Sequence, residues 1–333
     1  MSDEIRLTAN HWGVVRATVA QGRLVSVEAH PDDPDPSPIN DNLIGSLHGR
    51  ARILRPAIRK SWLEGRSGNV PRGRDSFVEV SWERALDLVA GELNRVRETH
   101  GNESIFAGSY GWSSAGRFHH AQSQLKRFLN TLGGFSSSEG NYSYNAALVM
   151  LPYIVGPFRQ HVAEATRWSV IAKNSDLVVL FGGLAMRNAQ VSDGGVATHR
   201  LRDNLQACAS AGVDFVNISP LRTDANDLLN SEWCPVRPGS DVALMLGLAH
   251  VLQSEGLHDR VFLDRYCVGF DAFEAYLTGA SDGVAKTPEW ASQHTGMAAE
   301  DITNLARRMA AGRTMISVAA GVQRTDYGEQ PLW

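Results

Sequence analysis

Four short apolar runs, each ending in a turn that contains glycine or proline, constrain the fold of this chain more than any other feature. They lie at 105–108, 177–183, 213–220 and 315–321. Helical patterns separate these runs, and each one is closed by glycine: 119–132, 195–211, 241–255 and 300–311. Strand, turn, helix and strand in this order are typical of an open, mostly parallel α/β sheet. We interpret the 174–220 unit and the 220–320 segment as two such sheets or halves.

The N-terminal part has a different pattern. Residues 11–29 alternate and are rich in valine, with Gln21-Gly22 between two strand-like runs, which predicts a hairpin. The fold class is therefore α/β, with a small N-terminal β-rich segment followed by open, mostly parallel α/β sheet domains. We place the domains at 1–60, 61–195 and 196–333. The last is expected to be truncated, because no crossover helix follows its final strand.

Eight arginine and lysine residues gather at 50–74, where Pro56 and Pro71 argue against one long helix. A nucleic-acid patch is one interpretation. The stretch has only Trp62 as an interleaved aromatic and the net charge of the chain is −4, which favours a solvated face or contacts to an anionic cofactor. A helix is then expected to begin near Ser81, a suitable N-cap.

Composition narrows the class of protein. With 43% hydrophobic and 20% charged residues the chain is an ordinary globular protein. No run of apolar residues is long enough for a membrane span, and the N-terminus carries no export signal, so we expect a cytoplasmic protein without a membrane partner. The three cysteines lie far apart, which makes disulfide, zinc and iron–sulfur sites weak interpretations. His119 and His120 are adjacent and point apart on a helix, so a shared metal is not expected.

The turns after the predicted strands carry groups that suit a ligand with phosphates and a base or amide edge. Ligands bind at the carboxyl ends of strands in open α/β sheets, where small residues let the backbone approach a phosphate. Each glycine alone is explained by a tight turn, and none of these turns matches the glycine-rich motif of an ordinary dinucleotide-binding or ATP-binding site. As a set they indicate a nucleotide-like cofactor. The residues are Gly182, Gly183, Arg187, Asn188, Ser219, Pro220, Arg222, Asp224, Arg237, Gly239, Asp241, Gly321, Gln323 and Arg324.

Three passages carry a resemblance to a known family. Residues 109–117, Ser-Tyr-Gly-Trp-Ser-Ser-Ala-Gly-Arg, resemble the active-site turn of the dimethyl sulfoxide reductase family of molybdopterin oxidoreductases. Residues 140–143, Gly-Asn-Tyr-Ser, are similar to the segment that carries that family's metal-bound serine. Gly321-Val322-Gln323-Arg324 resembles its later pterin-side motif. The likeness extends over essentially the whole chain and covers parts of the family's domains I–III.

This resemblance implies one molybdenum held by two molybdopterin guanine dinucleotides, with no iron–sulfur cluster and no haem. It implies that Ser143 is the metal ligand, that Tyr110 donates to the substrate oxygen, and that Trp112 forms a pocket wall and contacts the cofactor. The reaction implied is oxygen-atom transfer: two-electron reduction of an S-oxide such as biotin sulfoxide or methionine sulfoxide to the thioether. The electron donor, NADPH or a small redox protein, stays open.

Within the family, the serine at 143 and the absence of a cysteine cluster argue against the iron–sulfur-bearing members. Tyr110 and the missing export signal favour the biotin sulfoxide reductase branch, of which the chain resembles the N-terminal portion. The alternatives are a dimethyl sulfoxide or trimethylamine N-oxide reductase, or an inactive cofactor-binding fragment of such an enzyme. Ser143 has a simpler alternative interpretation as a hydroxyl that caps a turn. Tyr110 and Trp112 have one as aromatic side chains of the core.

Overall fold

The structure is a computed structural model that describes residues 4–65, 70–71, 73–108, 120–191 and 195–333. The chain forms two compact units. Unit 1 comprises residues 1–139 and 190–199, and unit 2 comprises residues 140–189 and 200–333. The three-domain division at 60/61 and 195/196 stays a prediction.

Unit 1 begins with an antiparallel sheet of β1 (Glu4–Asn10), β2 (Gly13–Ala20) and β3 (Arg23–Ala29), in the order β1-β2-β3. The predicted hairpin is confirmed. Its turn at Gln21-Gly22 has positive φ at both residues, 51° and 74°, as a two-residue hairpin turn of this kind requires. The short helix α1 (Leu43–His48) follows and contacts β3.

The rest of unit 1 has little sheet. The basic stretch forms β4 (Ala57–Arg59) and one turn of helix, α2 (Lys60–Leu63), and β4 pairs with β5 (Phe77–Glu79), so the described residues of this stretch contain no long helix, as predicted. The helix predicted from Ser81 is α3 (Trp82–His100), and the Ser81 side chain accepts a hydrogen bond from the Arg84 N–H. α4 (Ala121–Thr131) completes the unit.

One strand prediction in this unit is wrong. Residues 105–108 do not form a strand in the described structure; Phe106 makes only an isolated bridge to Ser136. A short apolar run does not distinguish a strand from a connecting segment, because pairing partners come from the tertiary structure.

Unit 2 is built around a parallel four-stranded sheet with the order β8-β7-β6-β9. The strands are β6 (Leu177–Phe181), β7 (Asp214–Ile218), β8 (Glu232–Cys234) and β9 (Thr314–Val318). The prediction of a mostly parallel sheet is confirmed. The interpretation of 174–220 and 220–320 as separate sheets is wrong, because β9 pairs along its whole length with β6.

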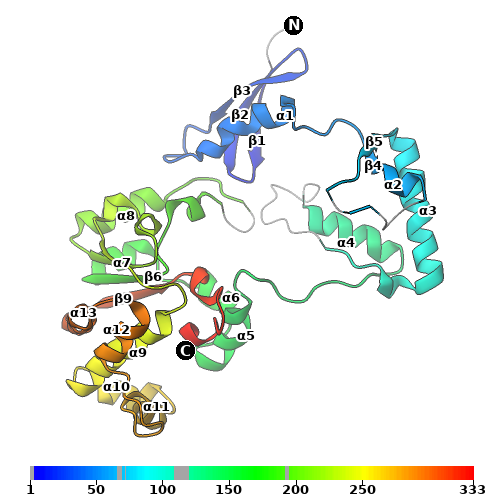
Figure 1. The fold of residues 1–333 in the computed structure, drawn as a ribbon. Coiled ribbons are helices and arrows are strands. Elements are labelled where there is room, and N and C mark those ends of the chain that lie inside the picture. Colours follow the sequence, from blue (N-terminus) through cyan, green and yellow to red (C-terminus); the bar gives the residue numbers. More distant parts are fainter. Residues whose placement is uncertain (1–3, 66–69, 72, 109–119, 192–194) are drawn as a thin grey trace. The chain divides into compact units, whose positions relative to one another are not determined.

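Helices cover both faces of this sheet. All residues of β6 are buried, and they alternate between two cores: Leu177, Val179 and Phe181 pack into one, Val178 and Leu180 into the other. α9 (Asp241–Ser254), α12 (Pro288–Thr295) and α13 (Ala299–Ala311) form the first core with the sheet. α7 (Trp168–Asn174) and α8 (Leu201–Ser210) form the second. Figure 1 shows these two groups on opposite sides of the strands. The sequence of β6 is apolar at every position because helices cover both faces of the sheet.

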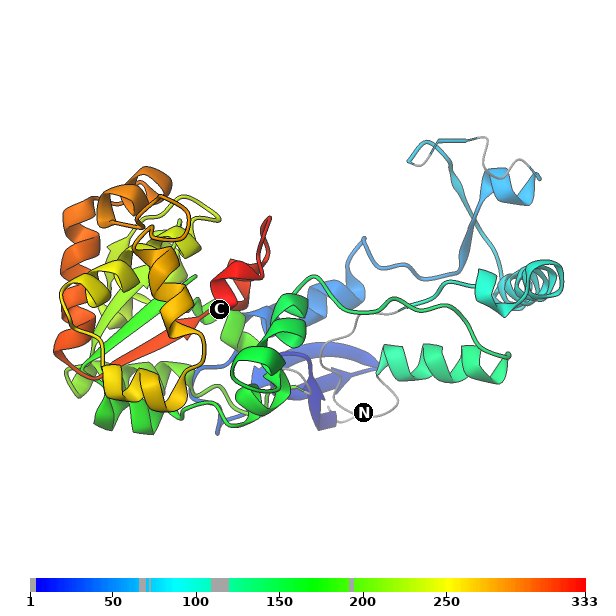
Figure 2. The same cartoon turned by 90° about the horizontal axis from the view of Figure 1, so that it is seen from below.

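The remaining helices of unit 2 lie around this centre. They are α5 (Asn145–Ile154), α6 (Phe158–Ala163), α10 (Arg260–Tyr266) and α11 (Phe270–Leu277). The helix predicted at 195–211 is shorter, since α8 begins at Leu201. After β9 come two short 3-10 turns, Ala320–Gln323 and Gln330–Leu332, and the latter contacts α5 and α9 (Figure 2).

Candidate functional site

The loops that follow β6, β7 and β9 meet at one edge of the unit 2 sheet. Gly182 lies against the loop after β9, where a Cβ would come within 3.0 Å of Ala319 Cβ and of Val322 Cγ1. Gly183 lies against the loop after β7, where a Cβ would overlap the Asp224 carbonyl oxygen. Both glycines have positive φ, 80° and 75°. The sequence needs glycine here because the backbones approach closely and the conformation is left-handed.

Three of the predicted residues form one hydrogen-bonded group at this edge. The Arg187 guanidinium lies 2.6 Å from Asp224 Oδ1, and the Ser219 hydroxyl donates to Asp224 Oδ2 at 2.7 Å. The Trp233 indole N–H donates to the Ser219 carbonyl oxygen at 2.8 Å and braces the same turn from β8. Asp224 therefore joins the turns after β6 and β7, and this use of its carboxylate was not predicted.

Other predicted residues at this edge are exposed. Asn188, Pro220 and Arg222 lie at the surface. Within the part of the chain that the structure describes, the Arg222 side chain makes no ion pair or hydrogen bond, so its positive charge is available at the carboxyl end of β7. An unpaired guanidinium next to a glycine-lined turn suits a phosphate group.

At the start of α9, the side chains of Ser240 and Arg237 bond to main-chain carbonyl groups. The Ser240 hydroxyl does not cap the helix; it donates to the Arg237 carbonyl oxygen at 2.7 Å. The Arg237 guanidinium donates to the Gln293 carbonyl oxygen at 2.7 Å, at the C-terminal end of α12, where a cation is favourable. Burial raises the pKa of Asp241, the first residue of α9. Gly239 approaches the loop after β9, where a Cβ would lie 2.9 Å from Thr325 Oγ1.

The segment with Ser143 lies beside the loop after β9. Asn141 Oδ1 accepts hydrogen bonds from the Ser143 N–H at 2.9 Å and the Tyr144 N–H at 2.8 Å, which makes a side-chain-closed turn. Arg324 Nε donates to the Ser143 carbonyl oxygen at 3.0 Å, and Gln323 Oε1 accepts from the Ala147 N–H at 2.9 Å. The structure thus brings Ser143 together with Gln323 and Arg324, and Arg324 lies 181 positions further along the chain.

A hollow of about 510 Å³ opens between these two segments. Most of the residues that line it have polar side chains: Asn141, Tyr142, Asn145, Ala146, Gln323, Arg324, Thr325 and Asp326. Asn145, Thr325 and Asp326 were not predicted as site residues. Their signal in the sequence is proximity to the two motifs, and it is too weak to single them out. Tyr110 and Trp112 lie outside the described residues.

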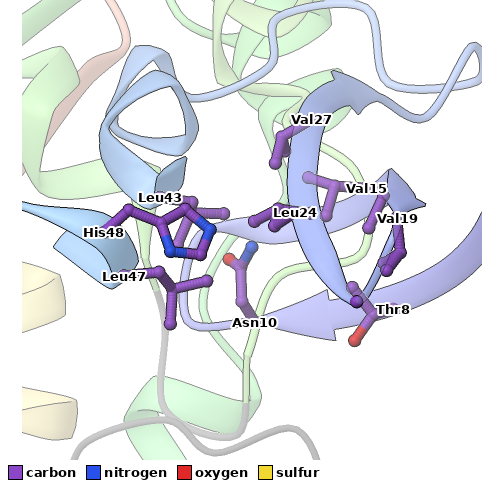
Figure 3. Close-up of a pocket in the computed structure, with 11 residues that line it drawn as sticks. Thr8, Asn10, Val15, Val19, Leu24, Val27, Leu43, Leu47 and His48 are labelled. Carbon is purple, nitrogen blue, oxygen red and sulfur yellow. The ribbon is translucent and has the colours of Figure 1, made fainter. Parts of the chain in front are cut away.

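A second hollow of about 510 Å³ lies in unit 1, between the β1–β3 sheet and α1 (Figure 3). Apolar side chains dominate it, among them Val15, Val19, Leu24, Leu43 and Leu47. It offers few donors or positive charges, so its chemistry does not suit a phosphate-bearing ligand.

Within the described ranges, no three or more His, Cys, Asp or Glu side chains gather as a metal site. No helix in those ranges combines the length and the apolarity that crossing a bilayer requires.

Fold and site together define a parallel α/β protein whose strand ends suit an anionic cofactor. Residues 52–333 match the family model described as molybdopterin oxidoreductase, and residues 8–48 match the molybdopterin oxidoreductase N-terminal domain. The chain belongs to the molybdopterin oxidoreductase family. The resemblance stated from the motifs and the fold class predicted with it are both confirmed.

The relatives are reductases. The chain is 41% identical over 325 residues to the dimethyl sulfoxide/trimethylamine N-oxide reductase of Cereibacter sphaeroides, covering 97% of this chain and 39% of that protein. It is 43% identical over 311 residues to the biotin sulfoxide reductase of the same organism, covering 93% and 42%. Trimethylamine-N-oxide reductase 1 of Escherichia coli (strain K12) is 40% identical, covering 100% of this chain and 40% of the relative.

The chain therefore spans about two fifths of the length of the curated relatives it matches. Among solved structures, acetylene hydratase from Pelobacter acetylenicus has a TM-score of 0.58 and 21% identity, covering 96% of this chain and 40% of that chain. At this identity the likeness concerns the fold alone.

Proposed function

We propose that the protein is a molybdenum-dependent reductase that converts an S-oxide, such as biotin sulfoxide or methionine sulfoxide, to the thioether. The reaction takes two electrons and two protons, breaks the S=O bond and releases the oxygen as water. The observation that carries the proposal is the pairing of the Ser143 segment with Gln323 and Arg324 beside a polar hollow. The family match and the relatives named above support the same chemistry.

The residues present fit a phosphate-bearing cofactor. Gly182 and Gly183 let the turns after β6, β7 and β9 approach one another at this edge, and Arg222 offers an unpaired guanidinium among the described residues there. We propose that a bis(molybdopterin guanine dinucleotide) is held there, without iron–sulfur cluster or haem. The proposed cofactor-binding set is Trp112, Gly182, Gly183, Arg187, Asn188, Ser219, Pro220, Arg222, Asp224, Arg237, Gly239, Asp241 and Gly321.

The protein's own part in the reaction is binding and orientation. Ser143 would hold the metal through its side-chain oxygen, a hard ligand that suits a high-valent metal. Tyr110 donates its O–H to the substrate oxygen, and Trp112 walls the pocket. The bound cofactor supplies the two-electron oxygen-atom transfer chemistry. The same proposal includes an electron donor, which is NADPH or a small redox protein. It also includes a cytoplasmic location and the chain's membership of a longer polypeptide.

The full-length protein, isolated from cells supplied with molybdate, tests this function. We expect molybdenum at one atom per chain and oxidation of a reduced viologen on addition of biotin sulfoxide or methionine sulfoxide. Absence of both metal and turnover would overturn the proposal.

A second function follows from the relatives. Because one of them is a dimethyl sulfoxide/trimethylamine N-oxide reductase at 41% identity, dimethyl sulfoxide and trimethylamine N-oxide belong in the same assay. If kcat/KM is greater for these than for biotin sulfoxide, the second function replaces the first.

A further inference from the structure

We propose that Gln323 and Arg324 are positioning residues for Ser143: they fix the serine segment through its main chain and do not act by reading the cofactor. This inference rests on the proposed function, since it concerns how the metal-binding serine is placed. It gives the two residues a different role from the one predicted for them.

The Gln323 side chain completes the N-terminus of α5. The first N–H groups of a helix have no partner within the helix. Tyr144, the N-cap residue of α5, provides no side-chain hydrogen bond. Gln323 Oε1 accepts from the N–H of Ala147, the third residue of the helix, from 176 positions further along the chain. Gln323 thus caps a helix whose N-cap residue, Tyr144, directly follows Ser143.

The Arg324 side chain holds Ser143 itself. Its Nε donates to the Ser143 carbonyl oxygen at 3.0 Å, while the Ser143 N–H donates to Asn141 Oδ1 at 2.9 Å. Both main-chain polar groups of Ser143 therefore have partners, one local and one from the loop after β9. A residue held on both sides has little freedom to rotate about its own backbone, which fixes the direction of its Cα–Cβ bond.

The loop that provides these two side chains is anchored to the sheet. Val322 is buried in the core that β6 forms with α9, α12 and α13. The Arg324 N–H donates to the Gly321 carbonyl oxygen at 3.0 Å. Gly328 packs so closely on the Gln323 carbonyl group that a Cβ there would overlap it. Through these contacts the loop holds the serine segment in a fixed position relative to the sheet.

Two substitutions separate positioning from cofactor recognition. Gln323→Glu keeps an acceptor at Oε1 and removes the amide donors, and a negative charge at a helix N-terminus is favourable. Arg324→Gln keeps an N–H donor as far along the side chain as Nε and removes the positive charge. A positioning role tolerates both changes. A role in reading a pterin edge or a phosphate tolerates neither.

The experiment uses the full-length holoenzyme and compares Gln323→Met and Arg324→Met with Gln323→Glu and Arg324→Gln. We expect each Met variant to keep its molybdenum and its KM and to lose about tenfold in kcat, the size of one lost hydrogen bond of about 1.4 kcal/mol. The paramagnetic resonance spectrum of its molybdenum should also change. The Glu and Gln variants should stay within about twofold of the wild type.

Matched controls are Gln253→Met and Arg307→Met, which remove contacts to Glu274 and Glu255 elsewhere in unit 2. Thermal unfolding of every variant separates loss of fold from loss of positioning. Loss of molybdenum or kcat in the Glu and Gln variants overturns the inference and favours cofactor recognition. Wild-type kcat and spectra in the Met variants also overturn it. If Ser143→Ala leaves the spectrum and kcat unchanged, the proposed function itself fails.

Discussion

Gly183 lies directly against the main-chain carbonyl of Asp224, and this contact joins the loops that follow β6 and β7. The next residue reinforces it, since the Leu184 N–H donates to the same carbonyl oxygen at 2.5 Å. The Asp224 carboxylate then receives Arg187 and Ser219. The proposed cofactor edge is therefore held by main-chain packing that only glycine permits.

Gly183→Ala should destabilise the protein, because its Cβ overlaps the Asp224 carbonyl group and φ is 75°. Gly212→Ala is a matched control: its φ is 80°, but nothing lies within 4 Å of its Cβ position. We expect the free energy of unfolding to fall by about 2 kcal/mol more in the first variant than in the second, as measured by denaturant titration. Equal losses would mean that the two loops are not in contact.

The buried pair of Asp33 and His199 should make unit 1 sensitive to acid. Burial by itself raises the pKa of Asp33, but hydrogen bonds from the His199 N–H at 2.9 Å and its Nδ1 at 2.7 Å outweigh it and hold that pKa below 3.8. A carboxyl group whose pKa is lowered by folding stabilises the folded state at pH values above its ordinary pKa. This stabilisation is lost as the pH falls through the pKa that the group has in the folded state.

The measurement compares denaturant unfolding of the wild type and Asp33→Asn at several pH values. The wild type should be the more stable near neutral pH, and its advantage should shrink as the pH falls below 3.8. Other carboxyl groups with a lowered pKa, such as Asp75 and Asp282, are present in both proteins. Their contribution therefore cancels in the difference between the two free energies of unfolding. An advantage that is constant over the whole range would contradict the role of this pair.

The cysteines should differ in reactivity. Cys267 is exposed, whereas Cys208 and Cys234 are buried. Burial raises the pKa of Cys234 to about 12 and also raises that of Cys208, so neither forms the nucleophilic thiolate near neutral pH. Brief iodoacetamide treatment followed by peptide mass spectrometry should find Cys267 alkylated and the other two intact, while all three should react in denatured protein. Labelling of Cys234 in the native state would show that the core opens.

Much of the fold could be predicted because local patterns carry it. The buried run at 177–181 needs no partner to identify it as an inner strand, and Ser81 marks a helix start by its own chemistry. The order of strands could not be predicted. β9 follows β8 in the chain but pairs with β6, and that choice depends on how α9, α12 and α13 pack.

The site shows the same division. The glycine turns and Ser143 stand out as short motifs, and the family match confirms the class of protein that they indicated. The contact of Gln323 with Ala147 spans 176 positions, and nothing in either local sequence points to the other. Arg237 looked like a ligand for an anion, yet in the structure its guanidinium bonds to carbonyl groups at the end of α12. A side chain's partner is set by tertiary packing, which no single motif contains.

X-ray absorption at the molybdenum edge, applied to the full-length wild type and Ser143→Ala, tests the proposed metal ligand most directly. The proposal predicts that the wild-type metal has an oxygen ligand from the protein, and that the variant keeps its sulfur ligands, lacks this oxygen and loses sulfoxide turnover. Identical oxygen coordination and equal turnover in the two proteins would contradict it.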